Sequence, residues 1–276
     1  MPLHDPISVL ALDVDKTVLN NDHEMPAAVQ DAITRVRNAG ALVVFASGRS
    51  PAAMRTAIRP HDGRETIIAY NGAWVGDIGG QPDDSHLRYG ENRLSVAAAR
   101  QVVTAARSHG IAIGWYVDET VYLDGATALF TAELAITGES SRITDLGTLS
   151  IAPHKLLAIG DPDQDLTNLA AALAPISAAR FSASHLLEIS APGVSKANGL
   201  AAFCQHLGLA LSHVAAIGDA ENDLEMIRAA GIGIAMGNAI ASVKEAARWV
   251  TATNDEAGVA VAIDRLFAEN LIVPIR

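Results

Sequence analysis

The sequence predicts an α/β protein whose core is a Rossmann-like, doubly wound parallel sheet, with a separate α+β domain inserted into it. Two observations support this fold class. Short apolar runs alternate with helical stretches near both ends of the chain, a pattern typical of parallel strands joined by right-handed crossovers. Between these parts, a polar, turn-rich stretch follows Gly79 and a different order of elements begins. We therefore expect a core formed by residues 1–84 and 188–276, and an inserted domain over residues 85–187.

The first part of the core is expected to alternate strands and helices. Short apolar runs bounded by polar residues are typical of buried strands, and a proline near the start of a one-sided apolar pattern is typical of helices. In chain order we expect a strand at Val9–Leu12, a helix at Pro26–Ala39, a strand at Leu42–Ala46, a helix at Pro51–Ile58, a strand at Thr66–Ala69 and a hairpin after the turn Tyr70-Asn71-Gly72.

The same criteria predict the strands and helices of the insert and of the last part of the chain. In the insert we expect a helix at Arg93–His109, strands at Ile111–Val117, Thr120–Leu123 and Leu156–Ile159, and a helix at Asp163–Ala174. Residues 126–149 carry no clear pattern. In the returning core we expect strands at Leu187–Ile189, Val214–Ile217 and Ile232–Ala235, and helices at Ser195–Leu207 and Gly258–Phe267.

The composition limits the classes of function. The chain has 276 residues, half of them hydrophobic, and one cysteine, which allows a sizeable core, excludes an internal disulfide and fits a reducing compartment. A net charge of -11 argues against nucleic acid as a partner. The chain shows no signal-peptide pattern and no apolar run long enough to span a membrane, so we expect a cytoplasmic protein. Its oligomeric state is not predicted.

Two carboxylates close the first strand. In the stretch VLALDVDKTVL, Asp13 follows the apolar run directly and Asp15 comes two places later. Alternate residues of an extended segment point the same way, and ligands of open α/β sheets bind at the carboxyl ends of the strands. Two carboxylates about 4 Å apart repel by about 4 kcal/mol, so one holds a proton or a cation lies between them. A solvated turn explains an isolated D-x-D equally well.

Polar residues also stand at other strand ends and at one helix start. These are Ser47, Lys196 and the trio Asp219, Asn222 and Asp223. Asp219 and Asp223 are four residues apart at a strand-to-helix turn, so both can face one site. With Asp13 they would offer an all-oxygen cage, which suits Mg²⁺. Phosphoryl transfer needs a metal, a cation on the phosphate oxygens and an attacking oxygen, and a carboxylate can be that nucleophile.

Four motifs stand in order along the chain. They are DVDKT, FASGRS, VSKANGL, and GDAENDLEM with AMGNA. With the segments IAYNGA and TNDEAGVA, and a cap-sized gap between the second and third motifs, they resemble the haloacid dehalogenase superfamily, in its Cof-type (IIB), sugar-phosphatase-like branch. The resemblance covers nearly the whole chain. It implies a Mg²⁺-dependent phosphomonoester hydrolase that acts on a small phosphorylated metabolite, with a sugar phosphate as the expected substrate.

The resemblance implies a role for each matching residue. Asp13 is expected to attack phosphorus and form an aspartyl-phosphate, while Asp15 acts as general acid and then as general base. The implied phosphate-binding residues are Ser47, Gly48, Lys196 and Asn222. The implied metal ligands are the Asp13 carboxylate, the backbone carbonyl of Asp15 and Asp219, with Asp223 supporting them. The insert is expected to be a cap that excludes water and selects the leaving group.

Lys16 departs from the family pattern, which has glycine at this position. Glycine permits close backbone approach and positive φ, whereas lysine forfeits both unless the site tolerates a Cβ. One interpretation is a tolerated replacement whose ammonium points toward solvent or the cap. The other is that Lys16 adds a second cation at the mouth of the site and favours multiply anionic substrates.

Two alternatives to a phosphatase remain at this point. A phosphomutase shares the aspartyl-phosphate chemistry on a related capped fold, but it interconverts isomers instead of releasing phosphate. A catalytically idle protein that only holds a phosphorylated ligand would gain thermal stability from the ligand without releasing phosphate.

Overall fold

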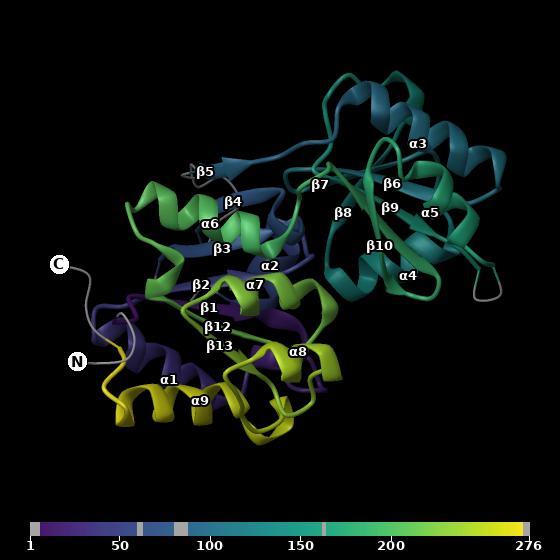
Figure 1. Cartoon of the computed structure of the whole chain (residues 1–276). Coiled ribbons are helices and arrows are strands. Elements are labelled where there is room, and N and C mark those ends of the chain that lie inside the picture. The colour runs from purple at the N-terminus through teal and green to yellow at the C-terminus, as the bar shows by residue number, and fades with distance from the viewer. Residues whose placement is uncertain (1–5, 60–62, 80–87, 162–163, 273–276) are drawn as a thin grey trace. The chain divides into compact units, whose positions relative to one another are not determined.

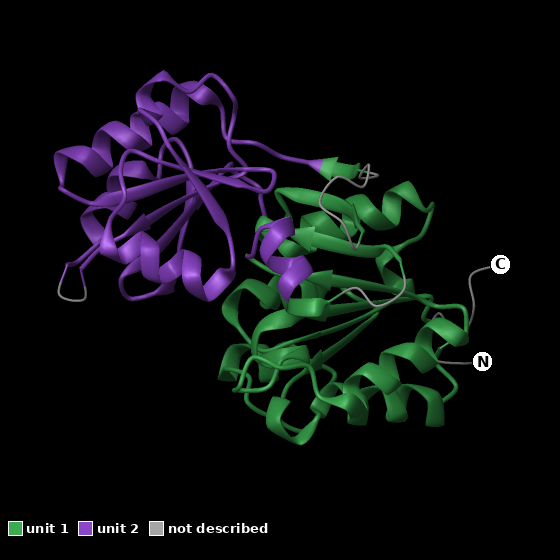
Figure 2. Cartoon of the chain, turned by 180° about the vertical axis from the view of Figure 1, so that it is seen from behind, with its two compact units in different colours: residues 1–48, 57–90, 195–276 green, residues 49–56, 91–194 purple. Residues whose placement is uncertain are grey.

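The computed structural model describes residues 6–59, 63–79, 88–161 and 164–272. The chain divides into two units, which Figure 2 shows in green and purple. The first unit comprises residues 1–48, 57–90 and 195–276, and the second comprises residues 49–56 and 91–194. Each unit is built around its own sheet.

The sheet of the first unit has eight strands among the described residues. Its spatial order is β14 (Trp249–Val250), β13 (Ile232–Ala235), β12 (Val214–Gly218), β1 (Val9–Asp13), β2 (Leu42–Ala46), β3 (Glu65–Ala69), β4 (Trp74–Ile78) and β5 (Arg88–Glu91). From β14 to β3 all neighbouring strands are parallel, and β4 runs antiparallel to β3. Every residue of β1 is buried, because helices cover both faces of such a sheet. This is why β1 has an unbroken apolar sequence up to Asp13.

The helices of the first unit pack in two groups. The helices are α1 (Ala27–Asn38), α6 (Lys196–His206), α7 (Leu224–Ala229), α8 (Ala241–Ala246) and α9 (Gly258–Ala268). α1 contacts α9, and the two lie side by side in Figure 1, while α7 contacts both α6 and α8. The buried residues of α1 are Val29, Ala32, Ile33 and Val36, which recur at helical spacing on one face. The helix α2 (Pro51–Ile58) connects β2 to β3 along the chain.

The second unit is an α+β domain with a mainly antiparallel sheet. Its order is β10 (Ala178–Ala183), β11 (Leu186–Ser190), β9 (Lys155–Ile159), β6 (Ala112–Val117), β7 (Thr120–Leu123) and β8 (Ser140–Ile143), and only the β7–β8 pair is parallel among these strands. Its helices are α3 (Val96–Ser108), α4 (Ala128–Thr137) and α5 (Thr167–Leu173). The ring of Phe130 in α4 packs on Gly114, where a Cβ would approach it to 2.7 Å.

The predicted fold class is confirmed, whereas the predicted end of the insert at residue 187 needs correction. The strand β11 pairs with β9 and β10 in the second sheet, and residues 188–194 belong to the second unit and not to the core. The signal was present in the sequence. LLEIS alternates buried and half-buried positions, which is typical of a sheet covered on one face, unlike the continuous apolar strands of the first unit.

Some predictions fall on residues outside the described ranges. They are the domain boundary at residue 84, the helix start at Asp163 and the expectation about a signal peptide, which concerns the opening residues. The part of that last predicted helix that is described begins at Thr167. No described helix has both the length and the apolar character needed to cross a membrane.

Candidate active site

Three neighbouring strands of the first sheet end beside one another. β1 lies between β2 and β12, and in the register Asp13 pairs with Ala46 while Leu12 pairs with Ile217. Because these strands are parallel, their carboxyl ends meet at one edge of the sheet. The topology therefore brings Asp13, Ser47 and Asp219 together from three distant parts of the chain.

Lys196 lies at the centre of the site. Its ammonium Nζ donates hydrogen bonds to Asp13 Oδ1 at 2.5 Å and to Asp223 Oδ1 at 2.7 Å, and the side chain is 1% exposed. Burial alone would lower the pKa of Lys196, but the charges of Asp13 and Asp223 outweigh burial and raise that pKa. The ammonium is thus charged at every physiological pH, and it joins two carboxylates from opposite ends of the sequence.

Three buried carboxylates form the acidic part of the site. One ligand atom from each of Asp13, Asp219 and Asp223 lies within 4.8 Å of the others. Burial, followed by the charge of Asp223, raises the pKa of Asp13, and the same two causes raise the pKa of Asp219 to about 6. Three carboxylates facing one ammonium leave an excess of negative charge, which is unfavourable in a buried site unless a cation or protons compensate it.

The donor set fits Mg²⁺. Asp13 Oδ2 is buried and has no hydrogen-bond partner among the described residues, so one oxygen of the cluster remains available to a ligand. Asp223 is held differently, because its Oδ2 accepts hydrogen bonds from the backbone N–H groups of Asp219 and Ala220, at 3.1 and 3.0 Å. The available atoms are all carboxylate oxygens, which hard divalent cations prefer.

Asp15 and Ser47 lie next to the acidic cluster. Ser47 Oγ donates to Asp15 Oδ2 at 3.3 Å, and Ser47 is buried while Asp15 is half-buried. Gly48 follows Ser47 in the same loop after β2 and is half-buried. Asp15 is absent from the trio of clustered carboxylates, so its side chain is placed beside the cluster and not within it.

Asn222 is hydrogen-bonded to Asn71, a residue of the turn after β3. Its Nδ2 donates to Oδ1 of Asn71 at 3.0 Å, across 151 positions of sequence. Asn71 comes two residues after the end of β3 and has a φ of 54°. Its place near the carboxyl end of a core strand was the feature of the sequence that could have marked Asn71 as a site residue. Asparagine also adopts positive φ more readily than other non-glycine residues.

Lys16 keeps the conformation that a glycine would adopt freely. Its φ is 59° and its ψ is 15°, in the left-handed region, which costs a lysine about 1 kcal/mol relative to glycine. Its backbone carbonyl accepts a hydrogen bond from Asn238 Nδ2 at 2.9 Å, and its side chain is exposed. While burial raises the pKa of Asp219, the charges of Lys196 and Lys16 oppose that rise, so Lys16 acts on the acidic cluster.

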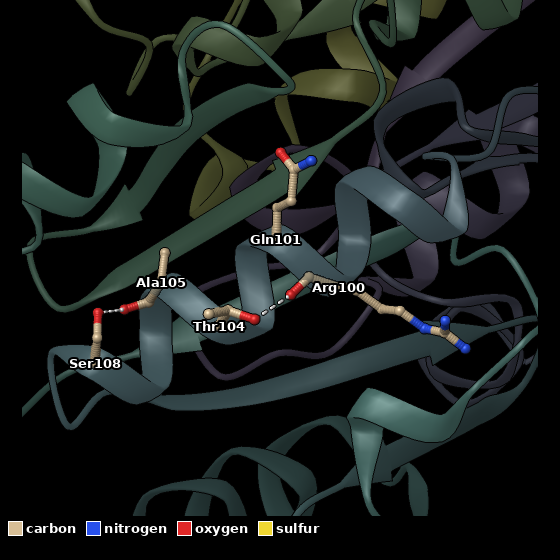
Figure 3. A pocket seen from close by; sticks show the side chains of 5 residues that line it. All are labelled: Arg100, Gln101, Thr104, Ala105 and Ser108. Carbon is tan, nitrogen blue, oxygen red and sulfur yellow. Dashed lines mark hydrogen bonds between the residues drawn. The ribbon is translucent and has the colours of Figure 1, made fainter.

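A hollow of about 370 Å³ in the second unit does not have the features of an active site. It lies along α3 and is lined by Arg100, Gln101, Thr104, Ala105 and Ser108, as Figure 3 shows. The hydroxyls of Thr104 and Ser108 donate to backbone carbonyls of their own helix at 2.9 and 2.8 Å. Arg100 donates to the carbonyl of Leu149 at 2.9 Å. The polar groups of this surface are therefore largely used within the protein.

A second cluster of side chains of the kinds that bind metals forms an ion-pair network. Glu91, Asp118 and His154 lie together in the second unit. The ring of His154 contacts Glu91 Oε1 through Nε2 at 2.8 Å and accepts the backbone N–H of Asp118 through Nδ1 at 3.1 Å. Arg93 donates to Glu91 at 2.8 Å and to Asp118 at 3.3 Å. Both ring nitrogens of His154 are hydrogen-bonded and the Arg93 guanidinium pairs with both carboxylates, so these groups bind one another.

The chain is similar to known proteins over most of its length. Residues 10–263 match the family of haloacid dehalogenase-like hydrolases. The HMP-PP phosphatase of Cronobacter sakazakii is 32% identical over 240 residues, which cover 83% of this chain and 84% of that protein. The 5-amino-6-(5-phospho-D-ribitylamino)uracil phosphatase YitU of Bacillus subtilis is 28% identical over 274 residues, covering 94% and 97% of the two chains.

Solved structures show the same architecture. A haloacid dehalogenase-like hydrolase from Bacteroides thetaiotaomicron has a TM-score of 0.81 at 28% identity, with 95% of this chain and 100% of that chain covered. TM0651 from Thermotoga maritima has a TM-score of 0.82 at 26% identity, with 94% and 97% covered.

Proposed function

Because the chain belongs to the haloacid dehalogenase-like hydrolases and is a phosphatase of that family, we propose that it hydrolyses a small phosphate monoester through an aspartyl-phosphate on Asp13. The family and enzyme class expected from the sequence motifs are thereby confirmed. The single observation that carries the proposed mechanism is the buried Asp13 carboxylate. One of its oxygens is held by Lys196 and the other has no partner among the described residues.

The reaction proceeds in two displacements. In the first, a carboxylate oxygen of Asp13 forms a bond to phosphorus as the ester P–O bond breaks, and Asp15 gives its proton to the leaving oxygen. In the second, Asp15 takes a proton from water as the water oxygen attacks phosphorus, and the bond to Asp13 breaks. Ser47 bonds Asp15 at 3.3 Å and helps to hold it in place for both transfers.

The remaining residues bind and neutralise the phosphoryl group. Lys196 supplies a buried positive charge, and Ser47, Gly48 and Asn222 are proposed as hydrogen-bond donors to the phosphoryl oxygens. The side chains of Asp13 and Asp219 and the backbone carbonyl of Asp15 are the groups that would hold Mg²⁺, with Asp223 supporting them. When bound, Mg²⁺ supplies positive charge that keeps the carboxylates ionised and offsets the charge of the phosphoryl oxygens.

A sugar phosphate or a related polyhydroxylated phosphate ester is the proposed substrate class. Support comes from the relative YitU, whose name describes action on a phosphorylated ribitylamino compound. The test is a phosphate-release panel of phosphorylated metabolites, including sugar monophosphates and bisphosphates, with Mg²⁺. We expect turnover of at least one sugar phosphate. Release from none of them contradicts the substrate class, and interconversion of isomers without net release indicates a mutase.

Magnesium is expected to raise the melting temperature more at about pH 7.5 than at about pH 5. Burial and the charge of Asp223 raise the pKa of Asp219 to about 6, so below that pH protons compete with the cation for the same oxygens. In the metal-free protein a raised folded pKa contributes stability that is fully present below the usual value of 3.8 and lost as the pH rises through 6. Magnesium restores this stability where the carboxylate is ionised.

The measurement is differential scanning calorimetry with and without Mg²⁺ at both pH values. At free magnesium about a hundredfold above the dissociation constant, the gain is about 2.7 kcal/mol. Sodium chloride at equal ionic strength is the control, because it screens charges without occupying the site. A magnesium shift as large at pH 5 as at pH 7.5 contradicts the assignment of these carboxylates as ligands.

Lys16 is proposed to favour substrates that carry more than one phosphate. Its exposed ammonium adds a positive charge to an acidic cluster whose other described cation, Lys196, is already shared by two carboxylates. We expect Lys16→Gly to lower kcat/KM about threefold more for bisphosphates than for monophosphates, as an exposed charge contributes about 0.2–1 kcal/mol. The unfolding midpoint should not fall, because glycine adopts this φ without strain. An unchanged ratio of kcat/KM values refutes the proposed role.

A further inference from the structure

The turn Tyr70–Gly72, between β3 and β4, has an unusual backbone. Its three residues have positive φ values of 52°, 54° and 106° in succession. Glycine and asparagine tolerate this region, but a buried tyrosine with positive φ is an outlier. Such conformations persist only where the surroundings enforce them, and they concentrate at functional sites.

The surroundings that enforce this turn are two segments of the active site. On one side, the backbone N–H of Asn71 donates to the carbonyl of Ser47 at 2.9 Å. On the other side, Gly72 lies against the start of α6, where a Cβ would come within 2.1 Å of the Ser195 carbonyl oxygen. β3, β4 and α6 lie together in Figure 1. The turn is therefore fixed between the loop that carries Ser47 and the helix start that carries Lys196.

The side chain of Asn71 reaches a third segment of the site. Its Oδ1 accepts the hydrogen bond from Asn222 Nδ2 at 3.0 Å, and Asn222 lies between Asp219 and Asp223 in sequence. A primary amide has two N–H donors in one plane, so a bond to one of them fixes the direction of the other. The backbone of Asn71, which carries the acceptor for Asn222, is in turn hydrogen-bonded to Ser47.

We propose that Asn71 is a positioning residue that sets the amide plane of Asn222 and so directs its second N–H toward the phosphoryl oxygens. The inference rests on the proposed function of the site, in which Asn222 binds phosphate. It goes further by assigning a role to the turn after β3. The left-handed backbone is what allows Asn71 to bond Ser47 with its main chain and Asn222 with its side chain at the same time.

The test separates the amide of Asn71 from the backbone conformation. In Asn71→Gly the positive φ is retained without strain and only the side-chain acceptor is lost, so the melting temperature should stay close to that of the parent. We expect kcat/KM to fall about fivefold to tenfold and the inhibition constant of inorganic phosphate to rise by a similar factor, as for one lost hydrogen bond. Asn270→Gly is the matched control, because Asn270 also has a positive φ, of 53°, outside the site.

A double-mutant cycle shows whether Asn71 acts through Asn222. If it does, the variant with both Asn71→Gly and Asn222→Ala has the same kcat/KM and phosphate affinity as Asn222→Ala alone. Losses that multiply in the double variant refute the positioning role, and so does an Asn71→Gly variant that behaves like the parent. A parent enzyme that releases no phosphate from any substrate refutes the proposed function instead, so the two failures are distinguishable.

Discussion

Replacing Asp13 by asparagine is expected to reduce phosphate release by about a thousandfold or more without lowering the stability of the fold. Loss of a nucleophile that acts together with a general acid has effects of this size or larger. The fold should tolerate the change, because asparagine keeps an oxygen acceptor for Lys196 and removes one of three buried negative charges. The measurement is phosphate release with Mg²⁺, together with thermal unfolding in a chelator.

The matched control for this variant is Asp264→Asn. Asp264 is 61% exposed on α9 and pairs with Arg35 on the surface, so its loss should change stability by less than about 1 kcal/mol and leave turnover intact. An Asp13→Asn enzyme as active as the parent ends the proposal of an aspartyl-phosphate. A variant that is inactive but also unfolded would leave activity uninterpretable, which is why both measurements are made on the same preparation.

Replacing Lys196 by methionine is expected to destabilise the metal-free protein by about 3–5 kcal/mol near pH 8 and to abolish turnover. Removing one partner from a buried ion pair leaves an uncompensated charge, and here the carboxylates of Asp13 and Asp223 both lose the ammonium between them. Methionine has a similar length without the charge, so little cavity remains. Denaturant unfolding in a chelator measures the effect, and Lys244→Met on α8 is the control.

The effect of Lys196→Met should be smaller at about pH 5 than at pH 8. Burial and the charge of Asp223 already raise the pKa of Asp13, while Lys196 opposes that rise; without Lys196 the pKa of Asp13 rises further. An acid with a raised folded pKa contributes stability that is present below its unfolded pKa and lost as the pH rises through its folded pKa. A destabilisation that does not depend on pH contradicts this account of the charge balance.

The core strands and the acidic residues could be predicted from the sequence because both depend on local pattern. A parallel strand buried on both faces has to be apolar throughout, and β1 is, so its end is marked by the first charged residue. Asp13 and Asp219 follow directly from such strand ends. The pairing of Lys196 with Asp13 could not be predicted from local pattern, because the two residues are 183 positions apart and the sheet order decides which strand ends meet.

The interior of the insert was harder to predict. The helix α4 lies in the stretch that showed no clear pattern, although Thr127 caps its start and Gly138 ends it with a φ of 69°. The caps were visible, but the apolar residues of α4 do not follow one face. Phe130 is buried, whereas Ile136 is 70% exposed. Periodicity therefore gave no helical signal, and the neighbouring strand β8 is exposed at every residue.

Asn71 shows a different kind of limit. The tripeptide Tyr-Asn-Gly correctly signalled a turn, because asparagine and glycine tolerate positive φ. Nothing in those three residues indicated that the amide of Asn71 would meet Asn222 from the other end of the chain. A turn residue at the carboxyl end of a core strand is thus a candidate site residue even when its local role is already explained.

The central place of β1 also bears on how the protein is made. One edge of β1 pairs with β2, which follows soon after it, but the other edge pairs with β12 through Val9 and Val214. During synthesis, β1 remains an apolar edge strand, with unpaired backbone groups, until β12 has emerged from the ribosome. Exposed apolar edge strands promote aggregation. Fragments that stop before β12 should accordingly be insoluble or bound by chaperones, however well their local elements form.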